Sequence, residues 1–359
     1  VVAFAPDQSK KEQIADNIKT TMKVTVDSEE PVEIRRITLE NMGDQEETLE
    51  VSNVFEPMLS RKEQDYAHPA FNNLFLKFDY DYDENILQIN RRKRGKNEKE
   101  IYACFKFSTD GEVIVDNEFE ISKEKLDTRG NFGIPKGIES STPFSNIAGL
   151  VTEPIVAMKK TIKLKAKEKI HLDFVISANE LKDIALINLK KYNNSENVKR
   201  AFEISKAKVD AENRYLGVKG KEIILYQKIL SYIIFNNPIK LMQKFETKKY
   251  NKQELWKYGI SGDIPIILAR IKDINDSYMV TSILKMYEYF RSKNIKVDIY
   301  GNIADQIAQY MNLNASCFAG FNIDIVHIIS IIYITILIEE MIFQLIYIEN
   351  KNSKTEDNH

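Results

Sequence analysis

Cysteine and histidine are scarce in this sequence of 359 residues, which has two cysteines and four histidines. The two thiols, Cys104 and Cys317, cannot frame a disulfide-stabilised secreted fold and cannot fill a tetrahedral zinc site unaided. The histidines do not have the spacing of metal ligands. We therefore expect no bound metal, and we expect Cys104, in the alternating run IYACFKF, to be packed in a strand.

An excess of charge of one sign is also lacking, since Lys and Arg total 51, Asp and Glu total 53, and the net charge is -2. A nucleic-acid surface requires a clustered positive field, so we expect no nucleic-acid partner. The basic run from Arg91 to Arg94 lies between two strand-like segments, which favours a solvated hairpin tip over a nucleic-acid patch.

A secretory leader is lacking where the sequence starts, because the apolar run from Val1 to Pro6 has no basic segment and no cleavage pattern. The sequence also lacks an initiator methionine and begins as though within a strand. We interpret the chain as a segment of a larger cytoplasmic protein, which other segments could attach to a membrane.

The first half of the sequence is predicted to form strands, because apolar and polar residues alternate along short segments separated by turn residues. Examples are Ile18 to Val26, Pro31 to Asn41, Glu47 to Pro57, IYACFKFS and EKIHLDFVIS. Short strands with no helical pattern between them predict an antiparallel sandwich in residues 1–178. The alternation predicts that one face of each strand packs and the other is wet.

Helical patterns follow in residues 179–298, which we assign to a helical linker region. Ser195 is expected to cap the first helix, and Gly217 lies where a left-handed C-terminal cap belongs. Two more helices with apolar stripes are predicted at Lys221 to Phe235 and Ser277 to Lys293. The predicted fold class is α+β, mainly β.

The tail, residues 299–359, contains the isoleucine-rich run from Ile325 to Ile338, which is followed by Glu339 and Glu340. A membrane span needs about 20 apolar residues, and each central acid costs roughly 2.5–3.5 kcal/mol. A single span is therefore disfavoured. An interfacial helix, a buried helix and a slipped reading frame remain open.

The stretch LWKYGISGDIPIILARI, from Leu255 to Ile271, holds the only tryptophan. Ser261 is disfavoured as a nucleophile, because the glycine that a nucleophile elbow needs two residues later is replaced by Asp263. We expect Asp263 to cap a helix over IPIILARI, with Pro265 in its first turn. A sugar site coexists with this interpretation, because an indole face beside a carboxylate suits C–H stacking and hydroxyl binding, with Trp256 and Asp263 as the binding residues.

His68, in DYAHPAF, is interpreted as a loop histidine bonded to backbone, with a glucan contact as the alternative. Asp79, Asp81 and Asp83 alternate along one segment. We interpret them as a solvated strand edge with Tyr80 and Tyr82 turned inward, because no glycine loop of the calcium-binding type follows.

Several motifs together resemble glycoside hydrolase family 94, formerly glycosyltransferase family 36, and in particular its cyclic β-1,2-glucan synthases and 1,2-β-oligoglucan phosphorylases. The similarity is carried by LWKYGISGDIPIILARI and KMYEYFRSKNIKVD, preceded in order by FAPD, VEIRRITLEN, DYAHPAFNNLF, RGNFGIPKGI and GLVTEPIVAMKKTIKL. It runs from Val1 to Asp298. Beyond Asp298 it ends, and a frameshift in an AT-rich gene would produce the Ile, Asn and Tyr bias of the tail.

The resemblance implies an antiparallel β-supersandwich followed by an α-helical linker segment and then an (α/α)₆ barrel. In that barrel an aspartic acid protonates the glycosidic oxygen while phosphate attacks and inverts the anomeric carbon. We expect this chain to lack the barrel, so no catalytic residue and no cofactor is assigned to it, and phosphate is a co-substrate of the parent enzyme only. The implied partners are a β-glucan or oligosaccharide and the missing C-terminal domains. A non-catalytic carbohydrate-binding or domain-organising module is the alternative.

Overall fold

The structure is a computed structural model that describes residues 2–126, 136–139, 142–234, 253, 255–256, 260–270, 277–302 and 345–347. The chain divides into two compact units, Val1–Asp210 and Ala211–His359. The first has two antiparallel sheets with a core between them, and the second has a parallel sheet with its own core.

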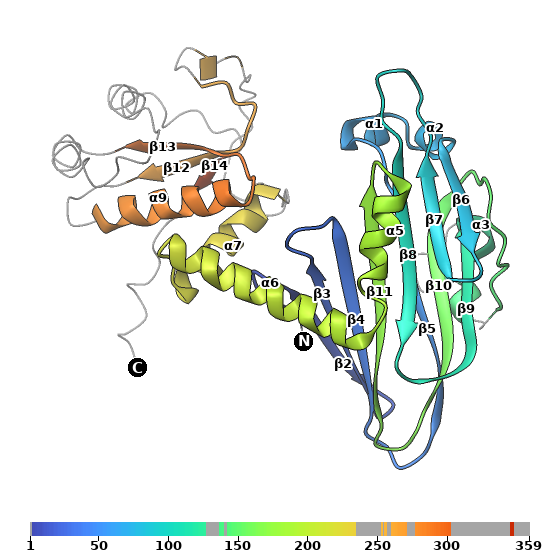
Figure 1. Cartoon of the computed structure of the whole chain (residues 1–359). Helices are drawn as coiled ribbons and strands as arrows, with labels where there is room; N and C mark the ends of the chain where they lie inside the picture. Colours follow the sequence, from blue (N-terminus) through green and yellow to red (C-terminus); the bar gives the residue numbers. More distant parts are fainter. Residues whose placement is uncertain are drawn as a thin grey trace. The chain divides into compact units, whose positions relative to one another are not determined.

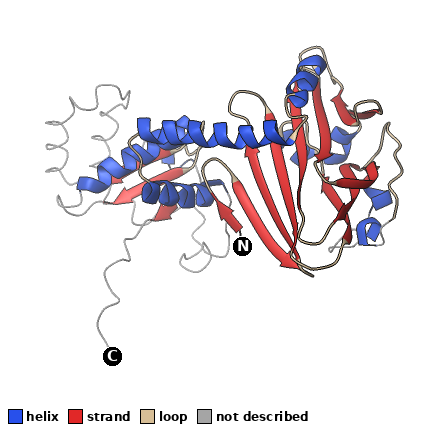
Figure 2. Cartoon of the chain, turned by 60° about the horizontal axis from the view of Figure 1, so that its bottom comes forward, coloured by secondary structure: helices blue, strands red, loops and turns tan. Residues whose placement is uncertain are grey.

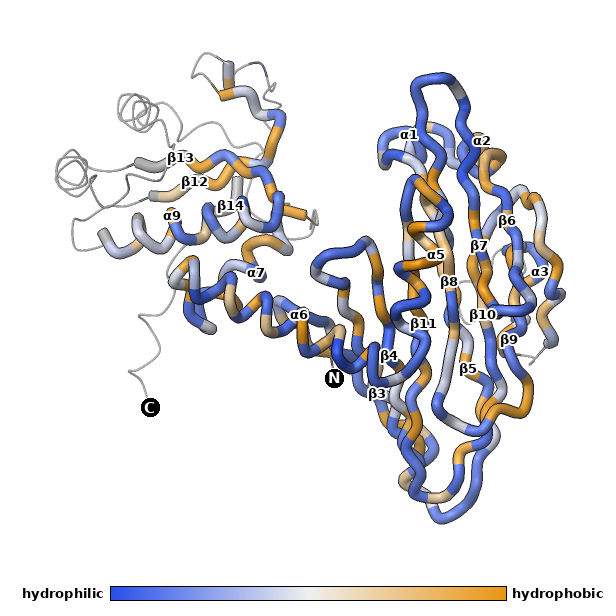
Figure 3. The backbone as a smooth tube through the Cα atoms, in the orientation of Figure 1, coloured by the Kyte–Doolittle hydropathy of each residue, from blue (hydrophilic) through white to orange (hydrophobic). Residues whose placement is uncertain are grey.

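An eight-stranded antiparallel sheet forms the larger layer of the first unit (Figure 1). In spatial order its strands are β1 (Val2–Phe4), β2 (Ser9–Ala15), β3 (Ile18–Val26), β4 (Val32–Asn41), β11 (Lys169–Asn179), β8 (Ile101–Thr109), β7 (Ile86–Arg91) and β6 (Leu76–Asp81). Hydrophobic and hydrophilic residues alternate along them (Figure 3), as a sheet with two unlike faces requires.

The smaller layer is a three-stranded antiparallel sheet in the order β5 (Glu47–Phe55), β10 (Pro154–Leu164) and β9 (Glu112–Ser122). The central strand β10 is buried along nearly its whole length. Its inward side chains Val156, Met158 and Ile162 join Phe105, Phe107 and Phe174 of the large sheet in one core. The antiparallel sandwich predicted from alternation is confirmed.

The outer face of the large sheet is not wet at its centre, and the prediction of one solvated face is wrong there. Helices α5 (Lys182–Lys190) and α6 (Ser195–Tyr215) contribute Ala185, Leu189, Val198 and Ala201 to a second apolar cluster. Cys104 joins that cluster and is buried in β8, as predicted, and burial raises the pKa of its thiol to about 11. The sequence pattern did not reveal α5, the nine-residue helix that covers this face.

Helix α6 matches the predicted helix, but Ser195 is not its cap. Asn194 supplies the cap, because its Oδ1 accepts the Asn197 amide at 2.8 Å. Ser195 is the first helical residue, and Arg36 donates to its hydroxyl at 2.8 Å and to its carbonyl oxygen at 2.6 Å. Gly217 has a φ of 62°, which confirms the predicted left-handed position after the helix.

The described residues of the first unit also form four shorter helices. They are α1 (Lys62–Ala67), α2 (Pro69–Asn73), α3 (Lys123–Leu126) and α4 (Lys136–Glu139). Figure 2 shows the helices in blue and the strands of both sheets in red.

Two local predictions in the first unit need correction. Arg92 to Arg94 are exposed as predicted, but Arg91 is buried, with 4% of its surface accessible. Tyr82 is 68% exposed rather than inward. Strand β6 ends at Asp81, whose carboxylate accepts the amides of Asp83 and Glu84, so alternation stops before Tyr82.

The second unit is built on a parallel three-stranded sheet in the order β13 (Asp298–Asn302), β12 (Ile266–Arg270) and β14 (Leu345–Tyr347). Helix α9 (Ser277–Ser292) connects β12 to β13, and α7 (Gly220–Ile234) precedes them. Both helices match predicted ones. Their apolar side chains share one core with Ile267 of β12, including Tyr226, Ile229, Met286 and Phe290.

The predicted helix over IPIILARI is wrong, because Ile266–Arg270 form strand β12. Asp263 is therefore not a helix cap, and the Pro265 carbonyl instead accepts the Asp298 amide at the start of β13, at 2.9 Å. A short run of isoleucines bounded by turn residues is typical of a strand in a parallel sheet, which is apolar rather than alternating.

Several predictions fall on residues that the structure does not describe, including Cys317 and the run from Ile325 to Ile338. Among the helices that are described, none has both the length and the apolar character that crossing a membrane would require.

Candidate functional site

Trp256 and Asp263 lie at one turn before β12, which we call the Trp256 turn (residues 255–256 and 260–265). The indole is 59% exposed, and its Nε1 donates to the Ser261 carbonyl oxygen at 3.3 Å. The Ser261 hydroxyl donates to the Asp263 carboxylate, and the Asp263 amide donates back to that hydroxyl at 3.2 Å. Ser261 thus links the aromatic ring to the acid.

Gly262 gives this turn its shape. Its φ of 67° lies in the left-handed region, which a residue with a Cβ atom enters only at a cost. The sharp bend places Ser261 and Asp263 within hydrogen-bond distance of each other. The result is an exposed ring face beside a carboxylate, which can stack on an apolar sugar face and accept from a hydroxyl.

His68 belongs to the other unit. It ends α1 and precedes α2, and its carbonyl oxygen accepts the Asn72 amide at 3.1 Å and the Asn72 side-chain amide at 3.1 Å. These bonds are made by the backbone carbonyl of His68, at the junction of the two short helices, and a hydrogen bond from its side chain to backbone stays a prediction. The structure brings Trp256 and Asp263 together and leaves His68 in a separate unit.

Asp110, His171 and Ser195 form a second polar cluster. The Asp110 carboxylate is 2.9 Å from His171 Nδ1 and accepts from the Ser195 hydroxyl at 3.4 Å. Burial raises the pKa of Asp110, but the hydrogen bonds from His171 outweigh that effect and hold the pKa below its usual value. Serine and imidazole bond to the same carboxylate instead of to each other, whereas a nucleophilic triad needs the imidazole against the hydroxyl.

A buried ion pair explains the role of that cluster. Arg36 forms two 2.8 Å hydrogen bonds with Asp173 on the neighbouring strand, and it also holds Ser195. The cluster therefore fixes the first turn of α6 onto the sheet. Within the described part of the chain, no group of three His, Cys, Asp or Glu residues is arranged to hold a metal ion.

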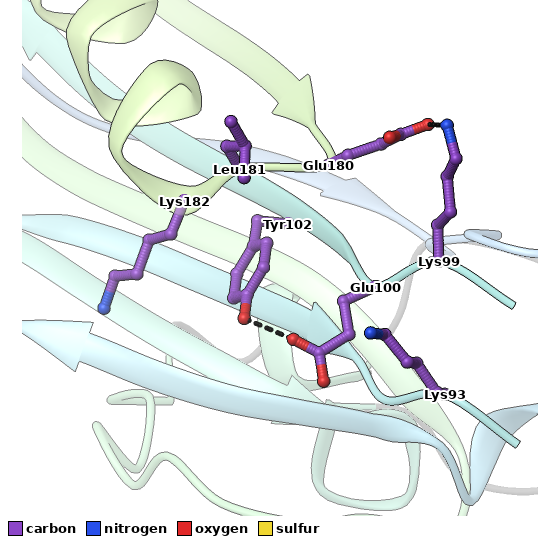
Figure 4. A pocket seen from close by; sticks show the side chains of 7 residues that line it. All are labelled: Lys93, Lys99, Glu100, Tyr102, Glu180, Leu181 and Lys182. Atoms are coloured by element: carbon purple, nitrogen blue, oxygen red, sulfur yellow. Dashed lines mark hydrogen bonds and ion pairs between the residues drawn. The ribbon is translucent and has the colours of Figure 1, made fainter. Parts of the chain in front are cut away.

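Sequence reasoning missed a pocket of about 350 Å³ at the amino end of α5 (Figure 4). We call it the Tyr102 pocket, and it is lined by Lys93, Lys99, Glu100, Tyr102, Glu180, Leu181 and Lys182. Alternation in IYACFKF places Tyr102 on the same face as Cys104, which was the one signal in the sequence. The other lining residues come from the loop before β8, the β11–α5 connection and the first residue of α5.

Two polar contacts organise the Tyr102 pocket. The Tyr102 hydroxyl donates to Glu100 at 2.7 Å, and this hydrogen bond, together with burial, raises the pKa of the tyrosine. Lys99 pairs with Glu180 at 2.8 Å on the rim. Figure 4 shows Tyr102 between Lys182 and Glu100, with the Lys99–Glu180 pair to one side.

Comparison with known families identifies the first unit. The model of the glycosyl hydrolase 94 supersandwich domain matches residues 1–195. The cyclic β-(1,2)-glucan synthase NdvB of Rhizobium meliloti (strain 1021) is 23% identical over 310 residues. That alignment covers 83% of this chain but 11% of the synthase, so the chain spans about one ninth of the relative's length.

Solved structures give weaker similarities. A candidate kojibiose phosphorylase from the human microbiome is 11% identical, with 55% of this chain and 23% of that chain covered and a TM-score of 0.32. A bacterial glucoamylase complexed with acarbose is 10% identical, with 56% and 26% covered and a TM-score of 0.35.

Proposed function

Because this chain belongs to glycoside hydrolase family 94 through its supersandwich domain, we propose that it is part of an enzyme that synthesises or phosphorolyses β-1,2-glucan. The observation that carries the proposal is the match over residues 1–195, which coincides with the two antiparallel sheets and the start of α6. The linkage comes from the name of the glucan synthase relative. Synthesis and phosphorolysis remain alternatives.

In this proposal the supersandwich is a binding and organising domain, and the barrel that carries the general acid lies elsewhere in the enzyme. The chain would not cleave or form a glycosidic bond by itself, and phosphate would act only in the complete enzyme. What supports this division is that the matching family model is that of the supersandwich domain. We place this part of the enzyme in the cytoplasm, because two cysteines in 359 residues fit a reducing compartment.

The Trp256 turn is the proposed glucan contact of the second unit. The half-exposed indole would stack on the C–H face of a glucosyl residue, and the Asp263 carboxylate would accept from its hydroxyl groups. His68, exposed between α1 and α2, is proposed as a separate contact of the first unit. These three residues keep the roles that the sequence suggested for them.

Fluorescence titration tests the proposal directly, because Trp256 is the only tryptophan. Linear β-1,2-glucan oligosaccharides should change the emission of the chain, whereas β-1,4-linked oligosaccharides of equal length should change it less. The Asp263→Asn variant keeps the shape of the turn and should weaken the response. An unchanged emission would leave a domain-organising role, and release or uptake of phosphate by the chain with glucan would contradict its catalytic silence.

A further inference from the structure

The Tyr102 pocket has a rigid aromatic wall. Tyr102 is tied to Glu100 by its hydroxyl and lies directly across the strand pair from Asn90. Leu181, the residue before α5, is 60% exposed at the same pocket. A fixed tyrosine ring next to an exposed aliphatic side chain offers an apolar surface to the C–H face of a pyranose ring.

Donors and acceptors surround that wall. In the described part of the chain, Lys93 and Lys182 have no ion-pair partner, so their ammonium groups can donate to a ligand. Glu100 is an acceptor beside the ring. Hydroxyl groups both donate and accept, so they can use both kinds of group.

The charge of the pocket favours a neutral ligand over an anion. Its lining has three lysines and two glutamates, a formal charge of +1, and one lysine is already paired with Glu180. A phosphate group bound here would lie among two carboxylates. The volume of about 350 Å³ is at the lower end of the range for small-molecule sites, roughly 300–1,000 Å³, which suits one or two sugar rings.

We propose that the Tyr102 pocket is a saccharide subsite that binds a glucosyl residue of a glucan chain. Tyr102 and Leu181 contact the apolar face of the ring, and Lys93, Lys182 and Glu100 bind its hydroxyl groups. The identity of the sugar rests on the proposed function, whereas the subsite itself rests on this pocket. The subsite would hold the polymer on the first unit.

Isothermal titration calorimetry with β-1,2-glucan oligosaccharides tests this subsite on the full chain. Loss of an aromatic contact is worth about 0.5–1.5 kcal/mol, so Tyr102→Ala should weaken binding about two- to tenfold. Tyr102→Phe keeps the ring and should bind within about twofold of the unchanged chain. Tyr215→Ala is the matched control, because Tyr215 is 91% exposed and lies outside the pocket.

Two variants keep the test decisive if Tyr102→Ala fails to fold. Leu181→Asp and Lys182→Glu change exposed residues at the start of α5 and should each weaken glucan binding. Wild-type affinity in both would overturn the subsite and leave the proposed function intact. If Trp256→Phe abolishes glucan binding while all pocket variants keep it, the subsite is also overturned and the proposed function stands. An unchanged chain that binds inorganic phosphate here and no glucan would overturn both.

Discussion

The two units of the chain differ in what their interiors contain. Among its described residues, the first buries six charged side chains, namely Arg36, Arg91, Glu120, Lys159, Lys160 and Asp173. In the second unit, the described residues that are buried are apolar or tyrosine, with Asn213 as the exception. The layers explain this difference, because central strands of the first unit are covered on both faces. Side chains that alternate onto the outer face are then buried as well.

The buried charges of the described first unit have partners. Arg36 and Asp173 form a bidentate pair, and Lys159 is 3.0 Å from Glu118 and donates to the Thr142 carbonyl oxygen at 3.1 Å. Breaking such a pair leaves an uncompensated charge inside the protein, which costs far more than losing an exposed pair. The stability of the first unit therefore depends on the pairing of buried charges, and that of the second depends on the packing of its apolar core.

The largest expected effect is that of Asp173→Ala, which leaves Arg36 buried without its carboxylate. Removal of one partner of a buried pair costs about 3–5 kcal/mol. Urea unfolding followed by circular dichroism should show this loss, and hydrogen exchange should locate it in β4 and β11. The apolar double variant Arg36→Met with Asp173→Leu should recover most of the stability, and Asp44→Ala on the surface should leave the midpoint unchanged. A single variant within about 1 kcal/mol of the unchanged chain would contradict the role of charge pairing.

Met286→Ala tests the other half of the comparison. Met286 is 2% exposed in the core of the second unit, and truncation of a buried methionine costs about 2–5 kcal/mol. Hydrogen exchange should accelerate in α9 and β12 and stay unchanged in β4 and β11. Met58→Ala is the matched control, because Met58 is 51% exposed and its truncation should change stability by less than about 0.5 kcal/mol. Equal acceleration in both units would argue against two separate cores.

The strands of the first unit could be predicted because apolar and polar residues alternate along each strand. This local signal in the sequence remains when helices cover the outer face of the sheet. Whether the outer face is buried could not be predicted, because α5 and α6 cover not only the adjacent β11 but also strands far away in the sequence, such as β4 and β8. Arg36 illustrates this: alternation assigns it to the wet face, and α6 buries it against Asp173. In the second unit the helices were predicted correctly, but the run of isoleucines in β12 has no period, so periodicity could not distinguish strand from helix.

The candidate sites divide in the same way. Trp256 and Asp263 are seven positions apart in one stretch of the sequence, so a local link through Ser261 is enough to bring them together. The Tyr102 pocket joins Lys99 to Glu180 across 81 positions, through the pairing of β8 with β11. No local pattern in a single sequence reports such a register, so this site emerged only from the fold.

Tyr192→Phe is expected to have a smaller effect. The Tyr192 hydroxyl donates to Asp27 at 2.7 Å, and Asp27 also accepts the amides of Glu29 and Glu30. Burial raises the pKa of Asp27, but these hydrogen bonds outweigh it and lower the pKa below 3.8. The stabilisation is therefore present above pH 3.8 and is lost as the pH falls through the folded value.

The variant should cost about 1 kcal/mol at neutral pH, the usual value of one hydrogen bond. The variant should also lose less stability on acidification, because the pKa of Asp27 would differ less between the folded and unfolded states. Urea midpoints measured between pH 7 and pH 3 give both quantities. Tyr66→Phe is the control, because Tyr66 is 89% exposed. If acid sensitivity is the same in Tyr192→Phe and the unchanged chain, Asp27 does not gain its low pKa from this hydroxyl.

The smallest expected effect is that of Lys99→Ala. Its distance from Glu180 is 2.8 Å, the same as that between Arg36 and Asp173, but the two side chains are 73% and 55% exposed. Water already solvates both charges, so the pair contributes about 0–1 kcal/mol, and salt should reduce even that. Urea unfolding at low and high ionic strength measures it. Lys99→Ala could instead lower the free energy of unfolding as much as Asp173→Ala does. The geometry of an ion pair, and not its burial, would then determine how much the pair stabilises this unit. The contrast between the two interiors would lose its physical basis.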